Sequence, residues 1–333
     1  MKTTAVLGAG SWGTALAVHL ARAGHGVRLW ARDEALVREL WASRTNARYL
    51  PEIRLADAIE PTASLDEALD GARFVVVAVP SHGLRTVVGH AAPLLATGSV
   101  LVSTAKGLET GSLERMSEVI ANETVGRCPI VVLSGPSFAM EVARGLPTAV
   151  LAASEQESAA AAVQEHFRGP GLRLYLSNDV AGVEIGGALK NVIAIAAGVV
   201  EGLHLGHNAL AALITRGLAE ITRVASAEGG KRETLAGLSG LGDLVLTCTG
   251  SLSRNRHVGI ELARGLPLHE ILGGMRMVAE GVRTTGAALA LGARHGIELP
   301  IAAQMKEVLD GRTVPADAVE ALMGRRQRAE VDG

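Results

Sequence analysis

A glycine-rich turn near the start of the chain constrains the fold most strongly. Residues 4–7 are β-branched and aliphatic, which predicts a strand, and they lead directly into Gly8-Ala9-Gly10-Ser11-Trp12-Gly13. A helical pattern over residues 14–23 follows, and residues 27–31 predict a second strand. A βαβ unit of about 30 residues that carries Gly-x-Gly-x-x-Gly at its first turn is typical of dinucleotide-binding folds.

Each glycine of this turn has its own expected role. Gly8 permits the tight turn, Gly10 lets the backbone approach a pyrophosphate, and Gly13 lets the helix pack closely on the strand. The N-terminus of the helix then offers unpaired N–H groups and a positive dipole end to the phosphates. We therefore predict a dinucleotide site here; the alternative is a glycine-rich turn without a ligand.

The residues after the second predicted strand indicate which dinucleotide binds. NAD-preferring sites usually place Asp or Glu there to accept a hydrogen bond from the ribose 2′-hydroxyl. This chain has Arg32, which favours a 2′-phosphate, followed by Asp33, which is also the expected N-cap of a helix over residues 33–43. We expect NADP(H) as the preferred cofactor, with NAD(H) still tolerated; an ordinary surface arginine is the alternative.

Strand and helix patterns alternate through the first half of the chain. Further strands are expected at residues 74–79, 100–103, 129–133, 149–153 and 172–176, with helices at 83–95, 112–122, 138–144 and 155–167. Residues 74–79 are apolar throughout, as in a parallel strand that is buried on both faces. We predict an α/β fold for residues 1–179, a Rossmann-type doubly wound sheet of about eight strands.

The second half of the chain predicts helices only. They are expected at residues 179–203, 208–227, 284–295, 301–309 and 316–323. We therefore predict an all-α domain over residues 180–325 that binds the substrate and carries the catalytic group. A frayed tail is expected over residues 326–333.

One lysine is hard to explain by structure alone. Lys190 follows Gly186 and Gly187 within an apolar run from residue 183 to 203. An unpaired buried ammonium costs several kcal/mol, so this amine must be paired or face a cleft. Two glycines weaken a helix unless a backbone or ligand comes close to them. The alternative is a lysine that reaches solvent from a glycine-packed helix.

Polar segments also follow three predicted strands, at residues 80–82, 104–107 and 134–139. Ligands of doubly wound sheets bind at this carboxyl edge. Lys106 comes directly after a strand and is well placed to meet a cofactor or an anionic substrate; a solvated loop lysine is the alternative.

Two segments of the second half add further polar groups. Residues 238–248 are apolar and glycine-rich around Asp243, and residues 251–256 form a donor cluster whose guanidinium groups suit a phosphate. Each segment by itself is more typical of an ordinary capped turn. Together with Lys190 and a nicotinamide fold, they indicate the reduction of a phosphorylated ketone.

Composition excludes several functions. The net charge is -2 and no basic block occurs, so no nucleic acid partner is expected. Cys128 and Cys248 lie far apart, which fits a reducing cytosol, and no histidine pair has metal-ligand spacing, so no metal is expected. The first residues do not form a signal peptide, and apolar stretches are interrupted before the roughly 20 residues that span a bilayer. We expect a cytoplasmic protein without membrane insertion.

On these motifs the chain resembles the bacterial NAD(P)-dependent glycerol-3-phosphate dehydrogenases. The motifs are residues 8–14, 46–51, 106–107, 135–139, 189–191, 208–217, 240–243, 247–248 and 253–256, in family order over nearly the whole length. The resemblance implies reversible hydride transfer between NAD(P)H and dihydroxyacetone phosphate, which yields sn-glycerol 3-phosphate for phospholipid synthesis. It also implies that Lys190 is the general acid and base.

The resemblance implies the other site residues as well. Those expected at the cofactor are Gly8, Gly10, Ser11, Trp12, Gly13, Arg32, Lys106, Ala139, Arg254, Val278 and Glu280. Those expected at the substrate are Lys106, Gly135, Ser137, Lys190, Asp243, Ser253, Arg254 and Asn255.

The chemistry agrees with this assignment. Hydride that reaches a ketone carbon leaves charge on the oxygen, which a nearby ammonium stabilises and then protonates. Asp243 would hold the Lys190 amine in place. Arg254, together with Lys106, would clamp the phosphate and convert its binding into orientation.

Two alternatives stay open. Another lysine-dependent dehydrogenase, acting on a hydroxyacid or a sugar phosphate, would need a carboxylate-clamping arginine in place of the cluster at residues 253–255. A redox sensor would bind NADPH without turnover. The sequence does not determine the oligomeric state, and a homodimer remains open.

Overall fold

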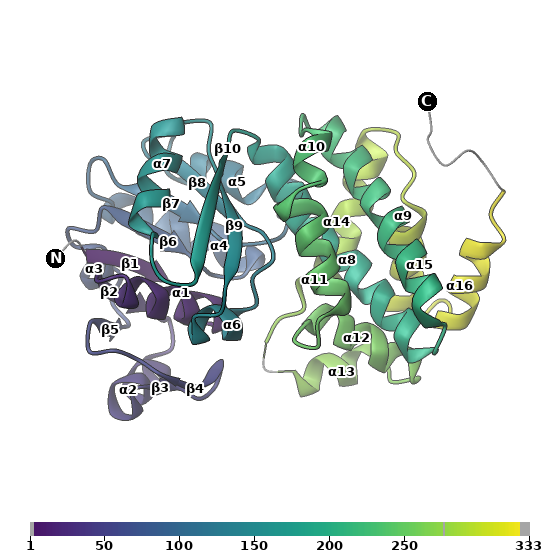
Figure 1. Cartoon of the computed structure of the whole chain (residues 1–333), viewed down its shortest axis with the longest axis horizontal. Coiled ribbons are helices and arrows are strands. Elements are labelled where there is room, and N and C mark those ends of the chain that lie inside the picture. Colours follow the sequence, from purple (N-terminus) through teal and green to yellow (C-terminus); the bar gives the residue numbers. More distant parts are fainter. Residues whose placement is uncertain (1–2, 276, 327–333) are drawn as a thin grey trace.

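The computed structural model describes residues 3–275 and 277–326. Its two halves, a sheet with flanking helices and a group of packed helices, lie side by side (Figure 1). The tail expected over residues 326–333 lies, apart from Arg326, outside the described residues.

The first half is the predicted Rossmann-type sheet. Its eight strands have the order β10-β9-β8-β7-β6-β1-β2-β5, and all neighbours are parallel except β8 and β9. The strands are β1 (Thr3–Leu7), β2 (Gly26–Trp30), β5 (Ile59–Thr62), β6 (Phe74–Val77), β7 (Val100–Ser103), β8 (Ile130–Ser134), β9 (Thr148–Ala153) and β10 (Leu172–Ser177). The helices are α1 (Ser11–Arg22), α2 (Glu34–Ser43), α3 (Leu65–Leu69), α4 (Ser81–Ala91), the 3-10 turn η1 (Ala92–Leu94), α5 (Met116–Glu123), α6 (Ala139–Arg144) and α7 (Glu157–His166).

Three strands of this half are not predicted by the sequence patterns. They are β5 and the two strands of a small hairpin, β3 (Thr45–Asn46) and β4 (Leu50–Arg54). β5 has only four residues, Ile-Glu-Pro-Thr, and lies at the sheet edge, where a proline does not break a ladder on both sides. Apolar patterning also does not encode strand direction, so the antiparallel pairing of β8 with β9 is visible only in the structure.

The second half is helical, and no strand occurs among its described residues after Ser177. Its elements are α8 (Val180–Gly202), α9 (Gly206–Ala227), α10 (Arg232–Leu235), the π-helical turn η2 (Leu238–Gly242), α11 (Asp243–Thr249), α12 (Arg254–Ala263), α13 (Leu268–Gly274), α14 (Glu280–Arg294), α15 (Pro300–Leu309) and α16 (Pro315–Met323). The expectation of a capped turn is therefore wrong for residues 238–248, whereas residues 251–256 do contain a turn and a side-chain cap. The first segment is helical, and in the second Ser253 is the N-cap of α12. Gly240 and Gly242 obscure the helical pattern of the first segment.

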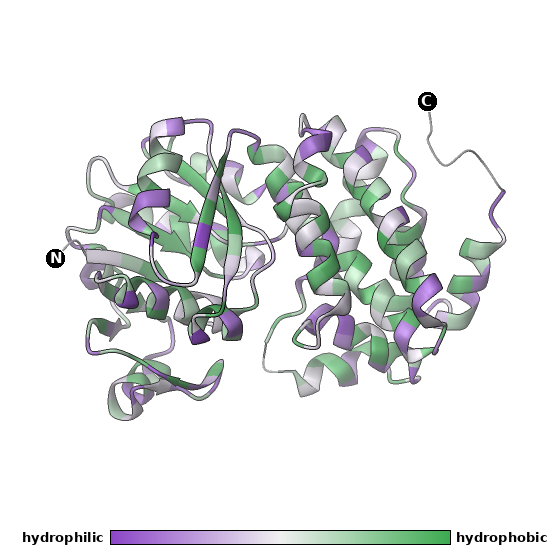
Figure 2. Cartoon of the chain, in the orientation of Figure 1, coloured by the Kyte–Doolittle hydropathy of each residue, from purple (hydrophilic) through white to green (hydrophobic). Residues whose placement is uncertain are grey.

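α8 is the central helix of this half. It is long and apolar enough to cross a membrane by length and composition, but its most apolar 18-residue window is 100% buried inside the protein. Figure 2 shows the hydrophobic colour concentrated on the sheet and on the inner helices. Glycines bring α12 against α8: a Cβ on Gly198 would lie 2.0 Å from the carbonyl oxygen of Arg256, and one on Gly259 would lie 1.9 Å from that of Ile195.

A buried carboxylate ties α8 to the first half. Glu184 of α8 accepts hydrogen bonds from the Ser117 N–H at 2.8 Å and from the Ser117 hydroxyl, and Arg115 donates to it at 3.2 Å. Burial raises the pKa of Glu184, and the Ser117 and Arg115 contacts oppose that rise. The start of α8 is thus fixed against α5, so that Lys190, further along the helix, is held next to the carboxyl edge of the sheet.

Candidate active site between the two halves

Lys190 is buried and paired. Its Nζ donates to Asp243 Oδ1 and, at 2.8 Å, to Thr247 Oγ1, and only 7% of its side chain is exposed. The alternative of a lysine that reaches solvent is therefore wrong. Asp243 and Thr247 are four residues apart in α11, so both side chains lie on the same helix face toward the amine.

The surroundings of Lys190 make its proton mobile. Burial lowers the pKa of Lys190 to about 7, because a charged amine is poorly solvated among apolar groups. The Asp243 carboxylate opposes this shift, and the Lys106 amine adds to it. An amine with a pKa near 7 can both donate and accept a proton at neutral pH, as a general acid and base must.

Asp243 bridges two amines that come from different halves. Its Oδ2 accepts from Lys106 Nζ at 2.7 Å, and Lys106 also donates to the Gly135 carbonyl oxygen at 3.0 Å. Asp243 is only 1% exposed. Two amines and one carboxylate leave a positive balance when both amines are protonated, which suits an oxygen on which negative charge develops.

Glycines create the room for this cluster. A Cβ on Gly187 would lie 2.8 Å from Ser134 Oγ and 3.7 Å from Lys106 Cγ, and one on Gly186 would lie 2.8 Å from the Ser239 carbonyl oxygen. The expectation that another part of the chain must approach both glycines is confirmed. α8 consequently packs directly on the loops that follow β7 and β8.

The first glycine turn has the geometry of a pyrophosphate cradle. Gly8 has φ +117, and its Cβ would lie 2.8 Å from the Ala78 carbonyl oxygen; a Cβ on Gly13 would lie 1.9 Å from that of Gly8. A Cβ on Gly10 meets nothing within 4 Å, so the space before it is open. No side chain caps α1, which leaves its first N–H groups free for a ligand.

The segment before α14 reaches both ends of this cradle. Ser11 Oγ donates to Met277 Sδ at 2.8 Å, and Glu280 accepts from the N–H of Ser81 at 3.1 Å and from its hydroxyl at 2.6 Å. Val278 lies between these contacts and is half-buried. Residues 277–280, which lead into α14, therefore reach from the glycine turn to the start of α4.

The N-terminus of α12 forms a second anion-binding geometry. Ser253 Oγ accepts from the Arg256 N–H at 3.3 Å, and the first N–H groups of the helix have no partner within it. Arg254 reaches solvent, yet surrounding protein lowers its pKa by desolvation, which the nearby Glu280 opposes. A side chain that is both solvated and enclosed by protein is typical of a cleft wall.

The remaining expected residues fall into two groups. Ser137 Oγ donates to the Gly135 carbonyl oxygen at 2.9 Å and so belongs to the Lys106 cluster, and Ala139 begins α6. The side-chain amide of Asn255 is occupied by contacts within the protein. It donates to Asn191 Oδ1 at 2.8 Å and accepts from the Gly281 N–H at 3.0 Å. Its backbone N–H is then the group left for a substrate.

Two expected cofactor residues stand apart from the cluster. Arg32 is exposed and forms no hydrogen bond or ion pair with the other candidates among the described residues. Trp12 of α1 is half-buried and packs against residues of α6, and its Nε1 has no partner among the described residues, so its backbone is the better candidate for a ligand contact.

Sequence reasoning missed two polar partners of the site. Thr247 contacts the Lys190 amine, and its spacing of four residues from Asp243 was the available signal. Ser81, at the start of α4, binds Glu280 across the two halves; the segment at residues 80–82 was predicted at the ligand edge of the sheet, but none of its residues was named as a site residue.

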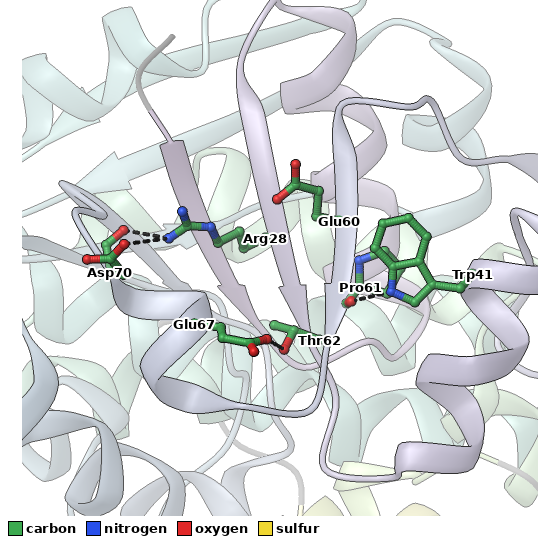
Figure 3. A pocket seen from close by; sticks show the side chains of 7 residues that line it. All are labelled: Arg28, Trp41, Glu60, Pro61, Thr62, Glu67 and Asp70. Atoms are coloured by element: carbon green, nitrogen blue, oxygen red, sulfur yellow. Dashed lines mark hydrogen bonds and ion pairs between the residues drawn. The ribbon is translucent and has the colours of Figure 1, made fainter.

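Two hollows of the first half lie elsewhere. One has a volume of about 280 Å³ and is lined by Arg28, Trp41, Glu60, Pro61, Thr62, Glu67 and Asp70, beside the edge strand β5 (Figure 3). The other has a volume of about 440 Å³ and is lined by residues 71–73 and 96–99. The lining of the first contains three carboxylates and one guanidinium, which disfavours a phosphate. The described residues contain no group of three or more side chains that could hold a metal ion.

Comparison with known proteins covers both halves. A model described as the N-terminus of NAD-dependent glycerol-3-phosphate dehydrogenase matches residues 3–160, and its C-terminal counterpart matches residues 179–320. The chain is also similar to proteins named glycerol-3-phosphate dehydrogenase [NAD(P)+]. It is 53% identical to that of Koribacter versatilis over 279 residues, which is 83% of each chain. It is 56% identical to that of Geobacter sulfurreducens over 276 residues, which is 82% of each chain. The crystal structure of glycerol-3-phosphate dehydrogenase from Coxiella burnetii superposes with a TM-score of 0.94 at 42% identity, covering 97% of this chain and 99% of that one.

Proposed function

Because this chain belongs to the family of NAD-dependent glycerol-3-phosphate dehydrogenases, we propose that it reduces dihydroxyacetone phosphate reversibly to sn-glycerol 3-phosphate, with Lys190 as general acid and base. It is an oxidoreductase that uses NAD(P). The observation that carries the role of Lys190 is its buried contact with Asp243 and Thr247 beside Lys106.

The protein supplies the proton for the reaction. The nicotinamide, when bound, supplies the hydride. In reduction the Lys190 ammonium donates its proton to the oxygen that becomes a hydroxyl, and in oxidation the neutral amine takes that proton back. Asp243 orients both amines, and Lys106 adds positive charge beside the reacting oxygen.

The phosphate is held at the other end of the substrate. The open N–H groups of α12 and the Arg254 guanidinium supply donors there, and phosphate matches both in geometry and in charge. Lys106 donates to Asp243 and to the Gly135 carbonyl oxygen, and these contacts support a role at the reactive end in addition to the phosphate clamp expected from the sequence.

The cofactor is held mainly by the first half. Gly8, Gly10 and Gly13 shape the turn, and the backbone N–H groups of Ser11 and Trp12 would donate to the pyrophosphate. Arg32 would bind the 2′-phosphate of NADP(H). The other expected residues, Ala139, Val278, Arg254 and Glu280, would form the wall around the nicotinamide end.

Two different units of the chain would bind the cofactor and the substrate. Residues 1–179 form the cofactor unit and residues 180–325 the substrate unit, with the boundary between β10 and α8. We place the enzyme in the cytoplasm, where its product enters phospholipid synthesis.

The test compares NADPH and NADH oxidation with dihydroxyacetone phosphate in the wild type and in Lys190→Ala. We expect kcat to fall by about 10³ in the variant, within the range for loss of a general acid, while NADPH still binds in a fluorescence titration. Lys231→Ala is the matched control, because that lysine is exposed and its amine donates to Asn178, far from Lys190 in the chain, while its backbone contact with Asp179 is kept in the variant. Near-normal turnover in Lys190→Ala would reject the assignment, and a wild type that binds NADPH without turnover would indicate the redox sensor instead.

A further inference from the structure

A second arginine lies beside the end of β2. Arg48, in the loop between β3 and β4, donates to Asp33 Oδ2 at 2.9 Å and to both carboxylate oxygens of Glu39 in α2. Asp33 follows Arg32 at the point where NAD-preferring folds carry the acidic residue that binds the ribose 2′-hydroxyl. Arg48 therefore contacts the one carboxylate that could favour NAD(H).

Both oxygens of Asp33 are already in use. Oδ1 accepts from the Ala35 N–H at 2.8 Å, which caps α2, and Oδ2 accepts from Arg48. The Ala35 N–H and, to a smaller extent, Arg48 lower the pKa of Asp33, so the carboxylate stays ionised within these contacts. A ribose hydroxyl would have to compete with a charged guanidinium for Oδ2.

The loop that carries Arg48 is fixed to the glycine turn. Asn46 is fully buried, and its Nδ2 donates to the Ala9 carbonyl oxygen at 2.9 Å and to Thr14 Oγ1 at 2.8 Å. Its Oδ1 accepts from the Tyr49 N–H at 3.2 Å. Arg48 is thus anchored next to the turn that holds the pyrophosphate, on the side where β2 ends.

The exposure of this ion pair points away from a purely stabilising role. Arg48 keeps 36% of its side chain exposed and Asp33 keeps 51%. Pairs this exposed contribute little to folding stability, because water solvates the separated charges well.

We propose that Arg48 sets the preference for NADP(H), because it holds Asp33 away from the ribose 2′-hydroxyl and cancels its charge. Arg32 is then free to bind the 2′-phosphate without repulsion from the neighbouring carboxylate. Without Arg48, the charges of Asp33 and Glu39 would repel that phosphate, and Asp33 would be open to a hydroxyl. This inference rests on the cofactor site of the proposed function and adds the residue that determines its specificity.

The experiment measures dissociation constants of 2′,5′-ADP and 5′-AMP by titration calorimetry, with kcat/KM for NADPH and NADH beside them. In Arg48→Gln we expect the preference for the 2′-phosphorylated ligand to fall about tenfold, as for loss of one charged contact. Arg38→Gln is the matched control, since Arg38 is an exposed arginine of the neighbouring helix α2, and its described ion pair is with Glu34. It should leave the preference unchanged.

A double variant separates specificity from loop structure. Asn also caps helices, so Asp33→Asn combined with Arg48→Gln should keep α2 intact while removing any gain in 5′-AMP binding. Equal weakening of both ligands with a lower Tm would show that Arg48 only holds the loop, and an unchanged preference would equally overturn the proposal.

Fragment binding does not depend on ketone reduction. A wild type that prefers 2′,5′-ADP but does not reduce dihydroxyacetone phosphate would therefore reject the proposed function alone.

Discussion

A carboxylate held between two cations occurs at the active site and again on the surface of the helical half. Asp243 is bridged by Lys190 and Lys106 and is 1% exposed. Asp310, at the end of α15, is bridged by Lys306 and by Arg312, the latter at 2.6 Å, and lies in solvent. Each carboxylate holds two cations within bonding distance.

Burial decides what the two arrangements do. At Asp310 the Lys306 and Arg312 contacts lower the pKa of the carboxyl, and water screens the rest. At Asp243 the environment instead changes the pKa of the paired amine, because desolvation lowers the pKa of Lys190 to about 7. An exposed pair therefore keeps its charges, whereas the buried one makes a proton available for chemistry.

The largest effect should come from removing the buried carboxylate. In Asp243→Asn the two amines lose the charge that orients them, so we expect kcat to fall by about 10³ and the free energy of unfolding by about 3 kcal/mol. Steady-state kinetics and urea unfolding measure the two quantities.

The surface arrangement offers the matched control for that variant. Asp310→Asn should leave kcat unchanged, since its partners Lys306 and Arg312 stay solvated. If both variants behaved alike, burial would not be what distinguishes the two sites.

The pH dependence should show an effect of intermediate size. Reduction needs the Lys190 ammonium and oxidation the neutral amine, so kcat/KM for reduction should fall about tenfold per unit above pH 7 and that for oxidation should fall below it. Profiles in both directions test this, and Asp310→Asn should reproduce the wild-type curves. A reduction profile that stays flat to pH 9 would contradict the assignment.

The same shift predicts a stability change of definite sign. The unfolded lysine keeps its proton up to about pH 10.5, whereas the folded one releases it near pH 7. Between these values the unfolded state binds more protons, so the contribution of Lys190 to the free energy of unfolding rises with pH. Urea unfolding of the wild type and of Lys190→Met at pH 6.5 and pH 9 should show the difference between them changing in favour of the wild type.

The smallest effect is expected at Thr247. Thr247→Val keeps the shape but removes one acceptor of the Lys190 amine, which should cost about 1 kcal/mol, or a fivefold fall in kcat. Thr249→Val is the control in the same helix, because its exposed hydroxyl bonds only to the Val245 carbonyl oxygen. An equal loss in both variants would point to helix stability rather than to the amine.

Helix caps and the roles of glycines could be predicted from the sequence, whereas some helices and strands could not. The roles of Gly8 and Gly13, the cap at Asp33 and the need for a close neighbour at Gly186 were predictable, because each follows from local backbone sterics or a local hydrogen bond. α11 and α12 were not, because α11 has only 7 residues and α12 begins with the polar run Arg-Asn-Arg-His, so neither shows a clear apolar period without its packing against α8. The edge strand β5 was missed for a similar reason: its four residues gain their pairing from β2.

By itself, the sequence determined the alternation of strands and helices, the glycine turn and a lysine that had to be paired or face a cleft. Only the tertiary structure decided that Asp243 and Thr247 pair with that lysine, that Lys106 joins them from the other half, and that Arg48 occupies Asp33. Local steric and periodic rules act over a few residues and can be read along the chain. Contacts between groups 53 or 137 positions apart depend on how helices and loops pack, and no local pattern records them.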